Sequence, residues 1–214
     1  MEIFSSLLDL LLHLDQHLLA MTQDYGTWVY LILFLIVFAE TGLVIMPFLP
    51  GDSLLFVAGT LAASGALNIE TMAILLAAAS FSGDNINYWI GRYLGPKVFT
   101  RKDSRLLNRV YLEKTHAFYE HHGGKTILFA RFLPIIRTFA PFVAGVGSMT
   151  YRRFLLYSAC GSAAWIATFV GGGYYFGNLP IVKQNLTAFV LLIIVATVLP
   201  GFITFIRHKL RSPS

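Results

Sequence analysis

The chain has 214 residues, of which 56% are hydrophobic and only 13% are charged. A soluble domain carries about a quarter charged residues, so the composition excludes an ordinary soluble protein and predicts an all-α polytopic membrane protein. The formal net charge is +5, but no Lys or Arg precedes Arg92. Basic residues that gather in the middle and at the end of a chain are typical of cytoplasmic loops rather than of a nucleic-acid-binding surface.

The N-terminal part, 1–21, is predicted to form an amphipathic helix on the membrane surface. Its leucines recur at helical spacing opposite Asp9, His13 and Gln16. A plain packing helix is an equal alternative.

An apolar segment over 28–46 approaches the twenty or so residues needed to span the bilayer, and Glu40 lies inside it. The chain is then broken by proline and glycine, and the following apolar stretch is too short to cross comfortably. Region 38–66 is therefore predicted to contain a first re-entrant hairpin, with helix breaks at Pro47, Pro50 and Gly51.

A full span is predicted over 71–94, followed by a basic connector, 97–125, on the cytoplasmic side. Residues 126–147 are apolar again, but Pro134 and Pro141 interrupt them. We predict a second re-entrant hairpin there.

Two ordinary spans, 154–176 and 186–206, lead to the basic tail 207–214. If the connector lies in the cytoplasm, these two spans return the tail to the cytoplasm. This holds only if 126–147 does not itself cross the membrane, which supports the hairpin prediction. The same count places the N-terminus in the cytoplasm, and the whole chain, 1–214, is expected to be one membrane domain.

The two broken regions repeat the same residues in the same order. Phe-Leu-Pro and then Phe-Val-Ala-Gly occur at 48–50 and 56–59, and again at 132–134 and 142–145. With one crossing between them, the copies are predicted to form an inverted repeat, an arrangement that places substrate near the bilayer midplane.

Four ionisable residues fall within or beside these breaks: Glu40, Asp52, Arg131 and Arg137. Each costs about 2.5 to 3.5 kcal/mol at the bilayer centre if it is unpaired. The arginines remain cationic and suit a phosphate or carboxylate, whereas the occupancy of a carboxyl by a proton depends on its surroundings.

We therefore predict a substrate site of all four residues, with Glu40 and Asp52 coupling to protons. Buried acid and arginine pairs that only lock the fold are the alternative. A secondary polar path through Asp84, Asn85 and Thr138 is expected, although capping or interhelical hydrogen bonding would explain the first two equally well. No metal site, cofactor or enzyme activity is expected, and a homo-oligomer remains open.

The sequence resembles the DedA family of bacterial inner-membrane proteins over nearly the whole chain. The motifs that carry the likeness are Phe38-Ala39-Glu40-Thr41-Gly42, Phe48-Leu49-Pro50-Gly51-Asp52-Ser53, Gly83-Asp84-Asn85-Ile86-Asn87-Tyr88, and Arg131-Phe132-Leu133-Pro134 continuing to Pro141. The resemblance implies a transporter-like fold shared with lipid scramblases and functional roles for Glu40, Asp52, Arg131 and Arg137. It also implies proton-motive-force dependence and, in some members, movement of undecaprenyl phosphate or phospholipid.

The leading hypothesis is a proton-linked lipid-phosphate translocase of the bacterial inner membrane, with a lipid head group and protons as its partners. A small-ion or proton antiporter of the osmotic or alkaline stress response is one rival. A structural membrane organiser and a lipid phosphatase are the others, the last without a recognisable nucleophile or metal set.

Overall fold

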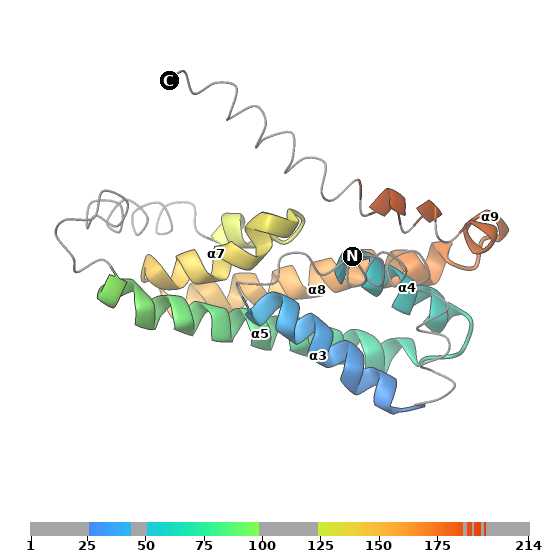
Figure 1. The fold of residues 1–214 in the computed structure, drawn as a ribbon, viewed down its shortest axis with the longest axis horizontal. Coiled ribbons are helices and arrows are strands. Elements are labelled where there is room, and N and C mark those ends of the chain that lie inside the picture. Colours follow the sequence, from blue (N-terminus) through green and yellow to red (C-terminus); the bar gives the residue numbers. More distant parts are fainter. Residues whose placement is uncertain are drawn as a thin grey trace, which may run out of the picture. The chain divides into compact units, whose positions relative to one another are not determined.

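The computed structural model describes residues 26–43, 51–98, 124–185 and six positions between 188 and 195. Every regular element in this part of the chain is a helix (Figure 1), which confirms the predicted all-α class. The described helices are α3 (Trp28–Gly42), α4 (Gly51–Ala63), α5 (Ile69–Val98), a short segment over 124–130, α7 (Pro134–Val146), α8 (Tyr151–Phe176) and α9 (Pro180–Gln184).

Several predicted features lie outside the described residues. They are the amphipathic helix 1–21, the helix breaks Pro47 and Pro50, most of the connector 97–125, most of the span 186–206, and the tail 207–214.

The described structure divides into two compact units, and both draw on segments far apart in the sequence. The first unit contains α3 up to Ile36, α4, α5 up to Leu76, and α8 from Trp165 onward. The second unit contains the rest of these three long helices together with 124–130 and α7.

In the first unit, α4 packs closely on the second half of α8. Its residues from Gly51 to Ala62 are all buried. Gly59 lies against Val170 and Gly173 of α8, and a side chain added at Gly173 would collide with the backbone carbonyl of Phe56. Small residues permit this approach, as at other helix contacts in membranes.

Replacing Gly173 by alanine is expected to destabilise the protein by about 1 to 3 kcal/mol, because the added Cβ meets backbone that cannot move aside. The neighbouring Gly171 and Gly172 offer matched controls, since an added Cβ meets nothing within 4 Å at either position. Thermal melts in detergent should show a loss for Gly173→Ala and no loss for the two controls. Equal melting temperatures for all three variants would contradict this packing.

In the second unit, α7 packs in a similar way on the second half of α5. A side chain added at Gly145 would collide with the carbonyl of Tyr88, and one added at Gly91 with the carbonyl of Phe142. Helix α7 begins at Pro134, at a position where the missing N–H of proline is tolerated.

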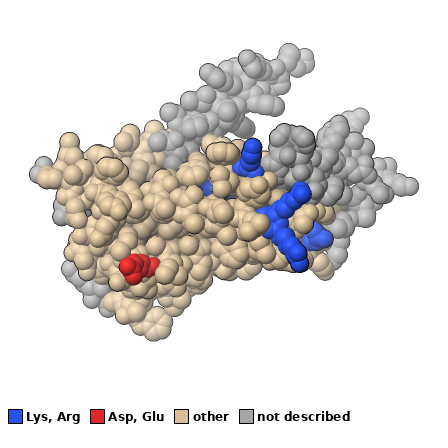
Figure 2. Space-filling model, turned by 180° about the vertical axis from the view of Figure 1, so that it is seen from behind, with Lys and Arg blue, Asp and Glu red and all other residues tan. Residues whose placement is uncertain are grey.

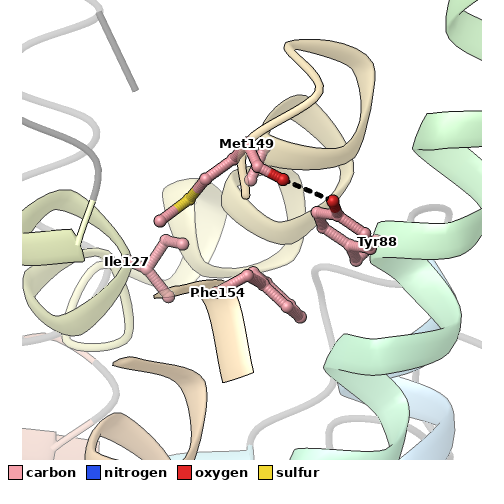
Figure 3. Packing of buried hydrophobic residues seen from close by; sticks show 5 residues of the cluster. Tyr88, Ile127, Met149 and Phe154 are labelled. Carbon is pink, nitrogen blue, oxygen red and sulfur yellow. Dashed lines mark hydrogen bonds between the residues drawn. The ribbon is translucent and has the colours of Figure 1, made fainter. Parts of the chain in front are cut away.

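A buried hydrophobic cluster in the second unit contains two stacked aromatic rings (Figure 3). Tyr88 stacks on Phe154 with ring centroids 4.4 Å apart, and both side chains are fully buried. The Tyr88 hydroxyl donates a hydrogen bond of 2.5 Å to the backbone carbonyl of Met149. Ile127 lies in the same cluster, and the cluster therefore joins α5, α8 and segment 124–130.

Among the described residues, only α8 is both long and apolar enough to cross a membrane. Helices α3 and α4 have 15 and 13 residues, short of the twenty or so that a span requires. Helix α5 has 30 residues, but polar residues interrupt its second half. On the face drawn in Figure 2, charged side chains cover only a few small areas, and the rest of the described surface is uncharged.

Candidate functional site

Glu40 and Arg137 form an ion pair inside the second unit. Glu40 lies in the last turn of α3 and Arg137 in the first turns of α7, and a guanidinium nitrogen of Arg137 donates to the Glu40 carboxylate. Both residues are buried, at 0% and 3% exposure. Two of the four residues predicted for the substrate site are therefore in contact, although 97 residues separate them in the chain.

Arg131 forms a second buried ion pair, and its partner is Asp84 of α5. The guanidinium also donates to the hydroxyl of Ser80 and, at 3.3 Å, to the carbonyl of Ser158. The Ser158 hydroxyl in turn donates to Asp84 at 2.7 Å, and that of Ser162 lies 3.4 Å from the hydroxyl of Ser80. Arg131 is thus held on α5 and α8 by one carboxylate and a set of serine oxygens.

The two ion pairs interact with each other. Arg137 acts electrostatically on Asp84 and on Arg131 as well as pairing with Glu40. We call these four residues the paired cluster; its two acids and two arginines carry no net charge when all are ionised. Each charge of the paired cluster has a close counter-ion of opposite sign, and buried charges persist only when they are paired in this way.

Asn87, one turn beyond Asp84 on α5, bonds to the backbone next to each member of the first ion pair. Its side-chain nitrogen donates to the backbone carbonyl of Thr41 at 3.2 Å and to that of Thr138 at 2.7 Å. These residues follow Glu40 and Arg137 directly in the chain. Thr138, predicted for the secondary polar path, is fully buried and contributes its carbonyl here.

Asp52 occupies a different environment, in the first unit. It lies at the second position of α4, and its carboxylate accepts a hydrogen bond of 2.8 Å from the indole of Trp165 on α8. Asp52 is 5% exposed and Trp165 is fully buried. The acid bonded to Arg131 is thus Asp84, which the sequence placed only on a secondary path.

Three other residues predicted for the site or for the helix breaks are Asn85, Gly51 and Pro141. Asn85 donates to the carbonyl of Phe81 in its own helix and accepts a hydrogen bond of 2.9 Å from Tyr151 of α8. Gly51 begins α4, and Pro141 is buried inside α7 without ending it. In the described part of the chain, no group of three or more His, Cys, Asp or Glu side chains could hold a metal ion.

Sequence reasoning missed the serines around Arg131, as well as Asn87 and Trp165. A signal was present, since Ser80 and Asp84 on one helix and Ser158 and Ser162 on another each lie four residues apart. Polar residues at that spacing share one face of a helix and can surround a common partner.

Comparison with known proteins identifies the family. The VTT domain matches residues 49–175. Protein DedA of Escherichia coli strain K12 is 53% identical over 211 residues, covering 98% of this chain and 96% of that protein. An uncharacterized membrane protein of Mycobacterium tuberculosis, Rv0364, is 41% identical, covering 86% and 81% of the two chains. The inner membrane protein YghB of Escherichia coli is 34% identical, covering 83% and 82%.

No solved structure matches the chain. The VTT-domain match and the near-full-length likeness to protein DedA confirm the resemblance that the sequence motifs indicated. The chain is a membrane protein and belongs to the DedA family.

Proposed function

We propose that this protein moves a lipid phosphate, such as undecaprenyl phosphate or a phospholipid, across the bacterial inner membrane and links that movement to protons. The observation that supports the proposal is the paired cluster. Two buried arginines, each neutralised by a buried acid, form a site for an anion that becomes available when an acid takes up a proton.

The proposed location follows the relatives, since YghB and YqjA of Escherichia coli are both named inner membrane proteins. We propose a multi-pass protein with the connector 97–125 and both termini in the cytoplasm. The distribution of Lys and Arg along the chain supports this orientation.

We propose an inverted repeat with two re-entrant hairpins. Helices α4 and α7 have 13 residues each, which suits hairpin arms better than spans. Their contacts also correspond, since the carbonyl of Phe56 in α4 faces Gly173 and that of Phe142 in α7 faces Gly91. Phe56 and Phe142 hold matching places in the two sequence motifs.

In the proposed cycle, protonation of Glu40 weakens its bond to Arg137 and leaves the guanidinium for the phosphate of the lipid. Deprotonation on the other side of the membrane restores the pair and displaces the head group, while the lipid tail stays in surrounding hydrocarbon. Protonation of Asp84 weakens its bond to Arg131 in the same way. Asp52, held by Trp165, remains a proposed second proton carrier.

Lipid movement by purified protein in liposomes tests this proposal directly. Arg137→Lys keeps the positive charge but loses the planar fork that binds two phosphate oxygens, so we expect translocation to slow by about tenfold or more. Arg152→Lys makes the same exchange at an exposed position of α8 and should leave the rate unchanged. Equal rates for wild type and Arg137→Lys would contradict the proposed clamp.

One rival is supported by the same geometry. Because each arginine is already bonded to an acid, the paired cluster could serve only to lock helices together. A locking role requires that the helices stay joined and does not require charge, whereas binding of a phosphate requires the guanidinium groups themselves.

A further inference from the structure

We propose that Asn87 is a positioning residue, which holds Glu40 and Arg137 in register for binding and release of the head group. The inference rests on the proposed function of the ion pair and adds a residue that makes no ion pair itself. Asn87 lies in α5, whereas Glu40 and Arg137 come from α3 and α7.

The geometry of the Asn87 side chain carries the inference. One amide nitrogen donates to the carbonyl of Thr41 and to that of Thr138, and these residues directly follow the two members of the pair. Asn87 is fully buried. The end of α3 and the start of α7 are therefore fastened to the same side chain, beside the atoms that must meet.

The orientation of the amide follows from its partners. Both neighbours are carbonyl groups, which accept but cannot donate, so the nitrogen must face them. Both hydrogens of this nitrogen are used, while the side-chain oxygen of Asn87 accepts no hydrogen bond from the residues that the structure describes. Its contribution to the site is thus the donation of two hydrogen bonds.

Positioning of this kind matters because the strength of an ion pair depends on the distance between its charged groups. Displacement of a functional group by about 0.5 Å is enough to impair a preorganised site. Without the Asn87 side chain, the backbone at Thr41 and Thr138 loses its common hydrogen-bond donor. The ion pair of Glu40 and Arg137 then re-forms less accurately after each release.

Asn178 provides a matched control. Its side-chain nitrogen also donates to a backbone carbonyl, that of Ala63, at 2.9 Å, but Asn178 is exposed and this bond involves neither α3 nor α7. The same substitution at both positions separates the loss of an amide-to-carbonyl hydrogen bond from the loss of support for the pair.

Three variants, Asn87→Asp, Asn87→Leu and Asn178→Asp, are compared with wild type in liposomes containing a fluorescent lipid phosphate, at neutral and at acidic pH. At neutral pH we expect Asn87→Asp to slow translocation about tenfold, because a carboxylate donates no hydrogen bond to the two carbonyls. At acidic pH the introduced carboxyl is protonated and donates one bond again, so its rate relative to wild type should recover in part.

Asn87→Leu should be slow at both pH values, because leucine cannot donate. Asn178→Asp should stay close to wild type at both. Recovery of Asn87→Asp in acid, with none for Asn87→Leu, distinguishes positioning from a general folding defect. A rate for Asn87→Asp equal to that of wild type at neutral pH, or a loss that acid does not reverse, would overturn the inference.

A second measurement does not depend on transport. The coupling between Glu40 and Arg137 is read from the non-additivity of melting temperatures in a double-mutant cycle of Glu40→Gln and Arg137→Gln. This coupling should shrink when Asn87 is replaced by leucine and stay unchanged when Asn178 is replaced by leucine. If wild type moves no lipid phosphate but the coupling still shrinks, the proposed function fails and the role of Asn87 stands; unchanged coupling overturns that role.

Discussion

Replacing Arg137 by glutamine is expected to destabilise the protein by about 3 to 5 kcal/mol, because the buried Glu40 carboxylate loses its guanidinium counter-ion. Melting temperature in detergent and the yield of membrane-inserted protein measure this loss. Arg152→Gln removes a positive charge from an exposed position and should change neither quantity.

The double variant Glu40→Gln with Arg137→Gln separates the two interpretations of the pair. Two neutral amides can bond to each other, so we expect most of the stability to return. Translocation should remain absent, because no guanidinium is present for the phosphate. Recovery of translocation together with stability would favour the locking role and contradict a head-group site.

Asp84→Asn is expected to destabilise the protein far more than Asp52→Asn does. The first substitution leaves Arg131 buried among serine oxygens without its carboxylate, a loss of about 3 kcal/mol or more. The second keeps an oxygen that can accept the bond from Trp165, and we expect a cost of about 1 kcal/mol or less.

Both substitutions exchange a carboxylate for an amide of the same size, so each serves as the control of the other. Melting curves of the two purified variants give the comparison. A larger loss for Asp52→Asn would show that Asp84 is not the acid on which Arg131 depends.

The helical class could be predicted from the sequence for physical reasons, and so could a meeting of buried acids with arginines, although not which acid pairs with which arginine. An apolar chain with few charges must form helices that satisfy their own backbone, and the rare ionisable residues inside it must meet one another. Helices α5 and α8 also begin and end within a few residues of the predicted spans, although among the described helices only α8 is apolar enough over its length to cross a membrane.

The partner of Arg131 could not be predicted in the same way. Asp52 and Asp84 are both acids in apolar surroundings, and sequence spacing does not show which of them faces the arginine. The choice depends on which helices pack together, and close contacts such as that of Gly161 with the Arg131 side chain help to decide it. The role of Asn87 could not be predicted for a related reason. Its partners are backbone carbonyls, which every residue carries and which leave no pattern in the sequence.

Binding of the lipid head group by the paired cluster would be visible in a cryo-EM map. The protein would be placed in nanodiscs containing undecaprenyl phosphate, at a pH low enough to protonate the cluster's acids. We expect phosphate density within hydrogen-bond distance of the Arg137 guanidinium, with Glu40 displaced from it. Intact ion pairs at both arginines, with lipid density only on the outer apolar surface, would show that the paired cluster is not the head-group site.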